Sequence, residues 1–440
     1  MPAGEPVSGG LVPWVLSARG VAALGEQAGR LLARVTDGPS AVRDVAFTLV
    51  SGRAVLEHRA VVLGGEVSEL AAGLGELAEG RAAKGVVTGR ALGSSGVVFV
   101  FPGQGSQWVG MARELLESSP VFAERMAECA AALEPFADGW SLLDVVCEGD
   151  EALLNRVDVV QPVLFAVMVS LAHLWRSLGV RPAAVVGHSQ GEIAAACVAG
   201  GLSLGDAARV VALRSRAIVA LSGRGGMVSV LAPQERVAGW LTDGLQVAVV
   251  NGPEQVVVSG VPDELDVFVA RCEGEGVQVR RIAVDYASHS PQVEELRAEL
   301  LEVLAGIEPR SGEVPLVSTV SGEVIDTAVM DAEYWFTNLR RTVRFDRALE
   351  ALLRDGHRVF VETSPHPVLL GAVTQAAEVA GVAGVAAVGT LRRNEGEGAR
   401  LLRNLAEVFV AGVDVDWSAW TKGGRLVDLP TYAFQHRHFW

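Results

Sequence analysis

The feature that most constrains this chain is a serine, Ser189, placed between an apolar strand and an Ala-rich helix. The segment 185–193 reads Val-Val-Gly-His-Ser-Gln-Gly-Glu-Ile. Small residues on both sides of the serine allow the sharp turn of a nucleophile elbow, which presents the hydroxyl at the N-terminus of the following helix. The five-residue pattern alone proves little in a chain with 50 glycines. Its setting strengthens it, because residues 182–186 read as a buried strand and residues 192–198 as a packed helix.

Length and charge exclude several classes of function. The 440 residues are enough for two or three domains with a large core, and 50% of them are hydrophobic. The net charge of −15 argues against nucleic acid as a partner, because phosphate binding needs clustered lysine and arginine. The sequence has neither a Gly-Lys-Ser/Thr phosphate loop nor a G-x-G-x-x-G motif after a strand, so nucleotide chemistry is unsupported.

Cysteine spacing and the apolar runs indicate a cytoplasmic protein without a metal site. The cysteines are widely spaced with no C-x-x-C pair, which favours reduced buried thiols over a zinc knuckle or a disulfide framework; they are Cys129, Cys147, Cys197 and Cys272. Residues 1–6 lack the basic and apolar regions of a signal peptide. Uninterrupted apolar runs such as Val97–Phe101 have the length of a strand, so we expect no membrane span.

The order of elements predicts an α/β protein with an inserted subdomain. Strand and helix alternate from residue 97, as in a parallel sheet. Short strands around a helix at 263–273 predict a ferredoxin-like subdomain inserted in that sheet. The first block reads as an N-terminal α/β linker domain, and the end is an aromatic-rich extended segment expected to lie against another domain. The predicted divisions are 1–95 (linker domain), 96–226 (core, first part), 227–286 (ferredoxin-like subdomain), 287–393 (core, second part) and 394–440 (C-terminal linker).

A serine nucleophile needs donors for an oxyanion and a base. The Gly-rich turn at 101–107 lets a backbone approach a ligand, so the N–H of Gln104 is a candidate oxyanion donor, although this turn taken alone favours an ordinary strand-to-helix loop. Histidine has the unperturbed pKa that suits the base. His289 is one candidate and His366, in a turn between prolines, is its rival; His188 adjoins the serine but points away from it in a sharp turn.

Arg214 is the third candidate site residue. It lies on an otherwise apolar helix predicted over residues 207–221. Its aliphatic stem allows the guanidinium to reach solvent from such a helix. Alternatively, its planar fork makes a bidentate pair with a substrate carboxylate. Spacing alone leaves both interpretations open.

Together these segments resemble the acyltransferase domain of a modular type I polyketide synthase, a relative of malonyl-CoA:acyl carrier protein transacylases. The resemblance covers nearly the whole chain, including linkers before and after the acyltransferase. The fold it implies is a hydrolase-like α/β parallel-sheet core with a ferredoxin-like subdomain. Besides the elbow, the 101–107 turn and the Arg214 helix, the matching segments are Asn251-Gly252-Pro253, Tyr286-Ala287-Ser288-His289 and Tyr432-Ala433-Phe434-Gln435.

The resemblance implies a role for each candidate. Ser189 becomes the nucleophile that accepts the acyl group, His289 its base, and Arg214 the anchor of the substrate's free carboxylate. The N–H groups of Gln104 and Gln190 become the oxyanion hole. The histidine of this family is usually oriented by a backbone carbonyl, expected here near Arg344.

The resemblance also implies the substrates and partners. Acyl-CoA is the donor, the phosphopantetheine of an acyl carrier protein is the acceptor, an adjacent ketosynthase is a neighbour, and no cofactor or metal is bound. Methylmalonyl-selective members resemble this chain at Gln190, at Tyr286 and Ser288, and at residues 156–161. Ser288 in place of a phenylalanine leaves room for a methyl branch, so (2S)-methylmalonyl-CoA is expected; the stereochemistry comes from the resemblance alone.

Alternatives remain open from the sequence. A malonyl-specific or a loading acyltransferase would share most motifs, although loading domains generally lack the arginine. A serine thioesterase would share the elbow, and a non-catalytic docking domain would share the linkers. The sequence shows no ketosynthase cysteine motif and no carrier-protein serine motif, which suggests a piece of a larger synthase. Four arginines are candidates for docking an acidic carrier domain, Arg340, Arg341, Arg344 and Arg347, although a solvated helix edge explains them as well.

Overall fold

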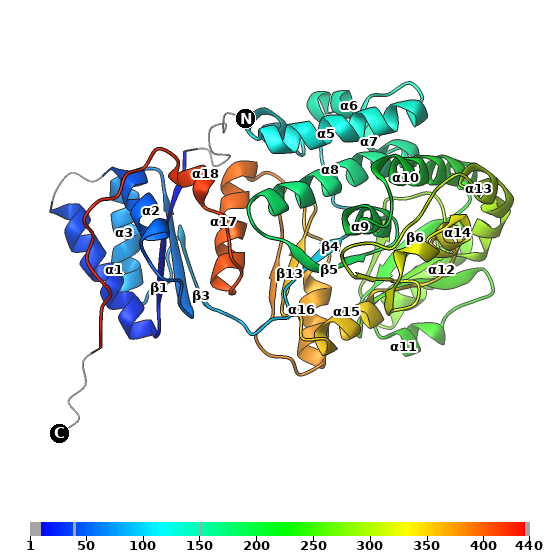
Figure 1. Ribbon diagram of the computed structural model, residues 1–440. Helices are drawn as coiled ribbons and strands as arrows, with labels where there is room; N and C mark the ends of the chain where they lie inside the picture. The colour runs from blue at the N-terminus through cyan, green and yellow to red at the C-terminus, as the bar shows by residue number, and fades with distance from the viewer. Residues whose placement is uncertain (1–9, 38–40, 150, 436–440) are drawn as a thin grey trace.

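The computed structural model describes residues 10–37, 41–149 and 151–435, which form three β-sheets surrounded by helices (Figure 1). Residues 1–6, on which the signal-peptide expectation rests, lie outside the described residues, as do the last five residues of the aromatic tail. In Figure 1 the N-terminal sheet lies at one end, the central sheet in the middle, and the sheet containing β6 at the other end.

The N-terminal sheet is antiparallel in the order β1-β2-β3, with strands Val12–Ala18, His58–Gly64 and Val86–Arg90. Helices α1 and α3 pack together against it, and α2 packs on β1; their bounds are Val21–Thr36 (α1), Val42–Ser51 (α2) and Val67–Ala78 (α3). The apolar residues of α1 recur at helical spacing and are buried. The N-terminal unit therefore has the α/β character expected from the sequence.

The central sheet has the order β11-β10-β5-β4-β13-β14 and is parallel except for β11. Its strands are Val97–Phe101 (β4), Pro182–Gly187 (β5), Leu316–Val317 (β10), Val324–Ile325 (β11), Val359–Glu362 (β13) and Ala386–Val388 (β14). Strand β4 is a continuous apolar run because both faces of the sheet are covered. Phe101 pairs with Gly187, so the turn after β4 and the elbow after β5 meet at the carboxyl edge of the sheet, where α/β proteins build their sites.

One face of this sheet is covered by helices that precede and follow β5. They are Arg113–Ser118 (α4), Pro120–Leu133 (α5), Leu142–Glu148 (α6), Glu151–Leu154 (α7), Val157–Ser177 (α8), Gly191–Ala199 (α9) and Leu204–Ile218 (α10). Helix α8 is long and apolar enough to cross a membrane, but 89% of its apolar window is buried inside the protein. It packs against α5, α9 and α10, which makes it the central helix of the core (Figure 1).

The opposite face packs against α15 and α16 and against the third sheet. The bounds of these two helices are Phe345–Arg354 (α15) and Leu370–Val379 (α16). Helices Arg297–Val303 (α13) and Ala332–Arg340 (α14) pack against each other, and α13 packs against α10. Short 3₁₀ helices are Glu134–Phe136, Val219–Leu221, Pro291–Leu296 and Thr327–Val329. The residues of β4 alternate between the two faces, since Phe99 belongs to the α8 side and Val98 to the α15 side.

The third sheet has the order β12-β7-β8-β6-β9. Its strands are Gly226–Val230 (β6), Leu245–Gly252 (β7), Gln255–Gly260 (β8), Val279–Ile282 (β9) and Val343–Arg344 (β12), and its helices are Gln234–Ala238 (α11) and Pro262–Gly274 (α12). From β6 to β9 the order strand-helix-strand-strand-helix-strand and the antiparallel pairing are those of a ferredoxin-like unit. Strand β12 extends this sheet in parallel beside β7, although it comes from outside the predicted range 227–286.

The C-terminal segment ties the N-terminal unit to the core. Helices Glu397–Val410 (α17) and Ser418–Thr421 (α18) follow β14, and α17 lies between the N-terminal sheet and the central sheet (Figure 1). The chain after α18 runs over the N-terminal unit, where Arg53 Nη2 donates to the Pro430 carbonyl at 2.7 Å. The Tyr432 hydroxyl accepts the Arg19 N–H at 3.0 Å. The extended end therefore lies against the N-terminal unit.

Candidate active site

Ser189 occupies a strained turn between β5 and α9. Its φ of 54° lies in the left-handed region, which few non-glycine residues adopt. The flanking glycines are required by close contact: a Cβ at Gly187 would lie 2.1 Å from Glu192 Cα, and a Cβ at Gly191 would lie 2.1 Å from the Phe101 carbonyl oxygen. The elbow inferred from the sequence is therefore present, and it packs directly against β4.

His289 holds the Ser189 hydroxyl. The Ser189 Oγ to His289 Nε2 distance is 2.8 Å, and His289 Nδ1 lies 2.8 Å from the Arg341 carbonyl oxygen. A carbonyl only accepts hydrogen bonds, so Nδ1 carries the proton and Nε2 is left to accept from the serine. Burial and the positive charge of Arg214 lower the pKa of His289 to about 3, while the bond to the Arg341 carbonyl raises it. The resting imidazole is neutral, as a general base must be.

The orienting carbonyl corrects one expectation, which placed it near Arg344. Helix α14 ends at Arg340, and the last carbonyls of a helix have no partner within it. The Leu339 carbonyl accepts the backbone N–H of His289 at 3.0 Å, and the Arg341 carbonyl accepts the proton on His289 Nδ1. Arg344 is instead in β12, where its N–H donates to the Thr319 carbonyl at 2.7 Å.

Arg214 is a buried cation without a carboxylate partner among the described residues. Its side chain, on α10, is 1% exposed, and Nε and Nη1 have no hydrogen-bond partner. Burial lowers its pKa to about 10, and the groups of Tyr286 and Glu192 raise it. A buried, unpaired guanidinium is unfavourable by several kcal/mol unless an anion joins it. This observation favours a carboxylate-binding role over a side chain that reaches solvent.

The Gly-rich turn after β4 lies beside the nucleophile. A Cβ at Gly103 would lie 4.0 Å from Ser189 Cβ. The Tyr286 hydroxyl donates to Gln104 Oε1 at 2.9 Å and so fixes this turn to the segment that carries His289. Gln190 directly follows Ser189 and is the N-cap residue of α9. The structure thus brings the turn and the helix N-terminus to the two sides of Ser189.

The residues expected to shape the acyl pocket are buried around the same point. Gln190 is 4% exposed, and neither polar atom of its side-chain amide has a partner. Tyr286 is 5% exposed and Ser288 is 7% exposed. Burial raises the pKa of Tyr286 to about 12, so its hydroxyl stays protonated and acts as a donor.

The two rival histidines have other partners. His188 Nε2 lies 2.9 Å from Asn251 Oδ1 of β7, and burial lowers the pKa of His188 to about 4. His366 Nδ1 accepts the Arg393 N–H at 3.2 Å, in the loop after β13. The bond to Asn251 connects the elbow to the ferredoxin-like sheet, so His188 contributes to how the two units are placed.

Sequence reasoning missed the polar groups behind the elbow. Glu192 is fully buried and contacts Thr319, Tyr334 and Asn338. Its signal in the sequence is a carboxylate on a helix that is otherwise apolar at residues 193–199, a position where charge is rare.

Two of the arginines expected to dock a carrier domain are already paired. Arg340 Nε lies 2.7 Å from Glu294, and Arg344 Nη2 lies 2.6 Å from Asp346. Arg341 and Arg347 are exposed. Only the latter two remain candidates for a docking contact.

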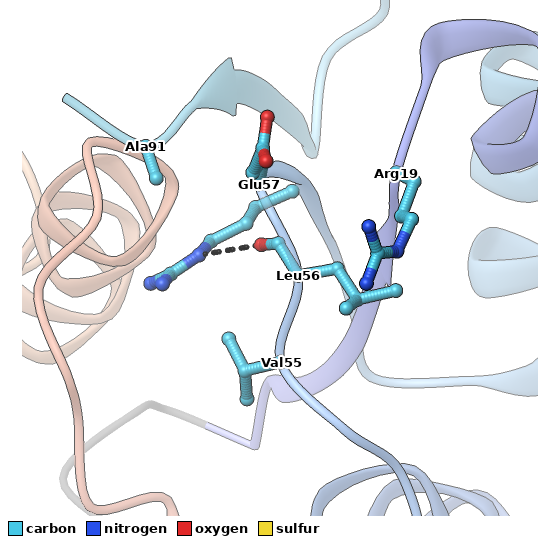
Figure 2. Close-up of a pocket in the computed structure, with 6 residues that line it drawn as sticks. Arg19, Val55, Leu56, Glu57 and Ala91 are labelled. Atoms are coloured by element: carbon cyan, nitrogen blue, oxygen red, sulfur yellow. Dashed lines mark hydrogen bonds between the residues drawn. The ribbon is translucent and has the colours of Figure 1, made fainter.

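A pocket of about 250 Å³ lies in the N-terminal unit, away from Ser189. Figure 2 shows the residues that line it and labels Arg19, Val55, Leu56, Glu57 and Ala91. None of the predicted site residues lines it. Within the described ranges, no group of three or more His, Cys, Asp or Glu side chains is placed to hold a metal ion.

Comparison with protein families gives two matches. Residues 98–415 match the model of the acyl transferase domain. Residues 15–81 match the model of a RhiE-like KS–MAT linker domain. The first match covers the elbow, the histidine and the buried arginine, and the second covers most of the N-terminal unit.

Similar proteins are large polyketide synthases. The chain is 56% identical over 442 residues to the spectinabilin polyketide synthase system protein NorA' of Streptomyces orinoci, which covers 98% of this chain and 12% of that protein. It is 52% identical over 438 residues to erythronolide synthase EryA2 of Saccharopolyspora erythraea, again 98% of this chain and 12% of the other. The chain therefore spans about an eighth of the length of these relatives.

Solved structures show the same fold. The acyltransferase domain from module 8 of the salinomycin polyketide synthase superposes with a TM-score of 0.90 at 53% identity, covering 94% of this chain and 99% of that one. The acyltransferase domain of SpnD, in complex with 2-(pent-4-yn-1-yl)malonyl, has a TM-score of 0.84 at 30% identity, covering 94% and 98%. A loading acyltransferase from the avermectin synthase has a TM-score of 0.68 at 48% identity, covering 71% and 100%.

Proposed function

The chain belongs to the acyl transferase domains of modular polyketide synthases, and we propose that it moves an extender acyl group from CoA to Ser189 and then to an acyl carrier protein. The observation that carries this proposal is the 2.8 Å contact between Ser189 Oγ and His289 Nε2, with the Nδ1 proton fixed by the Arg341 carbonyl. No bound cofactor takes part in it. The proposed setting is the cytoplasm, next to the ketosynthase and carrier domains of one synthase.

The first half-reaction loads the serine. His289 Nε2 takes the Ser189 proton as Oγ attacks the thioester carbonyl of the acyl-CoA. The oxyanion that forms accepts from the backbone N–H groups of Gln104 and Gln190, and one such donor contributes about 10²–10³ in rate. Collapse breaks the carbon–sulfur bond, and the CoA thiolate takes the proton from the His289 imidazolium. An acyl ester on Ser189 and free CoA result.

The second half-reaction unloads it. The phosphopantetheine thiol of the carrier protein gives its proton to His289 and attacks the Ser189 ester. A second tetrahedral oxyanion forms at the same donors and collapses to release Oγ, which regains the proton. The sequence of steps is a ping-pong exchange, because CoA leaves before the carrier thiol reacts.

Arg214 is the proposed anchor of the extender's free carboxylate. Its guanidinium is buried and forms no ion pair with a carboxylate in the part of the chain that the structure describes, and its charge is close enough to lower the pKa of His289. A malonyl-type acyl group carries the missing anion, and a simple starter acyl group does not. The malonyl derivative bound by the related SpnD domain has the same carboxylate.

The proposed extender is (2S)-methylmalonyl. Ser288 is a small side chain in a buried segment, which leaves volume for a methyl branch, and the unpartnered amide of Gln190 lies next to the nucleophile. A methyl group in a pocket contributes about 1–3 kcal/mol, so the preference over malonyl is about 10–200-fold.

The proposed division follows the boundaries 1–95, 96–226, 227–286, 287–393 and 394–440. Separate sheets support the first three limits, and the position of α17 between two sheets supports the last. Strand β12 belongs by pairing to the ferredoxin-like sheet, so the second core segment also serves that unit.

Substrate competition tests this function. The kcat/KM for transfer to a carrier protein is measured with methylmalonyl-, malonyl- and propionyl-CoA in the wild type and in Arg214→Ala. We expect methylmalonyl-CoA to be preferred in the wild type. In the variant, the loss of the guanidinium should lower kcat/KM for both carboxylated substrates by at least about 10²-fold relative to propionyl-CoA. A preference for malonyl-CoA in the wild type would refute the extender assignment. If Arg214→Ala left the ratio to propionyl-CoA unchanged, the proposed role of Arg214 would be wrong. Hydrolysis of the acyl group faster than its transfer to the carrier protein would refute the transferase activity.

A further inference from the structure

Glu192 is a buried carboxylate that the proposed mechanism does not use. It stands in the first turn of α9, three residues after Ser189, and its side chain is fully buried. Burying a carboxylate is unfavourable unless donors surround it. A carboxyl group in so unfavourable a place, directly behind the nucleophile, requires a physical reason.

The donors to Glu192 also hold the backbone of the elbow. Asn338 Nδ2 donates to Glu192 Oε2 at 3.1 Å and lies 3.5 Å from the Ser189 carbonyl oxygen. The Thr319 N–H donates to Glu192 Oε2 at 3.3 Å. Thr319 Oγ1 lies 2.8 Å from Glu192 Oε2 and 2.9 Å from the Gly187 carbonyl oxygen, and its one proton is donated to one of these two acceptors. The Tyr334 hydroxyl donates to Oε1. The carboxylate thus connects both sides of the elbow to one cluster of polar groups.

Two of these donors come from the helix whose end holds the base. Tyr334 and Asn338 lie on α14 one turn apart, on the same face. The chain at the end of α14 supplies the Leu339 and Arg341 carbonyls that accept from the backbone and from Nδ1 of His289. A continuous path therefore runs from the nucleophile's own helix, through Glu192, to the carbonyls that orient the base.

We infer that Glu192 is a positioning residue, which holds α14 against α9 so that His289 Nε2 meets Ser189 Oγ. The inference deepens the proposed function and rests on it. The carboxylate suits this role because it only accepts hydrogen bonds, and its partners here are donors. Burial raises the pKa of Glu192, and the bonds from Tyr334 and Thr319 lower it.

The matched substitutions are Glu192→Gln and Glu397→Gln. Glutamine keeps the volume of the glutamate side chain, but at position 192 it places an N–H₂ donor opposite groups that are themselves donors. Glu397 is 2% exposed and accepts backbone N–H groups of Ala112 and Leu115, the latter at 2.9 Å, so it is an equally buried carboxylate at the α4–α17 contact. It has no contact with the Ser189 cluster among the interactions of the described residues.

Two readouts separate positioning from stability. The first is kcat and KM for acyl transfer, and the second is the rate at which a fluorophosphonate labels Ser189, which reports the Ser–His pair without any acyl-CoA. We expect Glu192→Gln to lower kcat and the labelling rate about 10²-fold with KM unchanged, because a displacement near 1 Å at the reacting atoms has that effect. Glu397→Gln should lower the melting temperature comparably and leave both rates within about twofold.

The outcomes are distinct. Equal labelling rates in the wild type and Glu192→Gln would overturn the inference, even if acyl transfer were absent. A wild type that is labelled but takes no acyl group from any CoA thioester would overturn the proposed function alone, and the labelling ratio would still test Glu192. If Glu192→Gln does not fold, Asn338→Ala and Tyr334→Phe remove single donors of the same path. Each should slow labelling at unchanged KM, and unchanged labelling in both would overturn the inference.

Discussion

At the scale of single residues, His289 makes the stability of the fold depend on pH. Its pKa is lowered to about 3 in the folded chain, from an ordinary value of 6.5. Between these values the unfolded chain binds more protons at this site, so the stability that the site contributes is present above pH 6.5 and is lost as pH falls. We expect His289→Gln to flatten this part of the curve. The test is to measure the melting temperatures of the wild type and of His289→Gln at about pH 7.5 and about pH 4.5, above and below the ordinary histidine pKa. An equal drop in melting temperature in both proteins would contradict the low pKa of His289.

The sequence predicted which side chains form the candidate site, but it did not predict which backbone carbonyl orients His289. Ser189, His289 and Arg214 were identified because their residue types fit acyl transfer and because they fall in segments that resemble the family. The carbonyl that orients His289 was expected near Arg344 and lies at Arg341. Any residue has a carbonyl, so only the place where α14 ends, a packing property, decides which one faces the imidazole.

Glu192 shows a second limit at this scale. A buried carboxylate is visible in the sequence as an acidic residue on an apolar helix, but its partners are 127 to 146 residues away in the chain. Contacts of that separation follow from the fold and not from local patterns, so the network behind the elbow had no sequence-level signature.

At the scale of elements, the elbow depends on close packing between α9 and β4. Gly191→Ala would place a Cβ 2.1 Å from the Phe101 carbonyl oxygen and 2.5 Å from that of Pro102, both backbone atoms that cannot move aside. We expect a loss of about 1–3 kcal/mol or more in stability and slower loading of Ser189, because the turn that carries Gln104 is pushed away.

The control for this substitution is Gly371→Ala on α16, where a Cβ would meet no atom within 4 Å. Alanine favours a helix by up to about 1 kcal/mol over glycine, so this variant should be as stable as the wild type or more so. Thermal unfolding and the rate of acyl-enzyme formation measure both variants. A Gly191→Ala protein with wild-type values would contradict the close-packed elbow.

Long or uniformly apolar elements were predictable and short ones were not. The strand predicted at 97–101 has those bounds in the structure, and the predicted elbow strand differs from β5 by one residue. Strands β10, β11 and β12 have two residues each and carry no periodicity that a sequence window can detect. β12 was therefore missed, although it extends the ferredoxin-like sheet.

At the scale of the whole molecule, a buried arginine joins the N-terminal unit to α17. Arg59 Nη1 donates to the carbonyls of Phe409 at 2.9 Å and Val413 at 3.2 Å, and its guanidinium lies 4.7 Å from the Phe409 ring centroid. Its Nε donates to the Leu56 carbonyl at 3.1 Å, beside the pocket of Figure 2. The contact is made almost wholly by backbone acceptors, so it fixes the spacing of the two units.

We expect Arg59→Ala to lower the free energy of unfolding by about 2–4 kcal/mol, since charged hydrogen bonds contribute about 1.5–3 kcal/mol each and are not fully additive. Arg19→Ala, at an exposed side chain of the same pocket, should change it by less than about 0.5 kcal/mol. Neither should alter the loading of Ser189, which lies in another unit. Denaturant unfolding and acyl-enzyme formation check this. If Arg59→Ala were fully folded and still loaded Ser189 more slowly, the contact between Arg59 and α17 would influence the active site.

The central claim is that Ser189 carries the acyl group between CoA and a carrier protein, and intact-mass spectrometry tests it most directly. The wild type and Ser189→Ala are incubated with an equimolar mixture of methylmalonyl-, malonyl- and propionyl-CoA, and a phosphopantetheinylated carrier protein is then added. We expect one methylmalonyl group on the wild type, none on Ser189→Ala, and transfer of the group to the carrier thiol. Acylation that persists in Ser189→Ala, or release of the acyl group to water and not to the carrier, would contradict it.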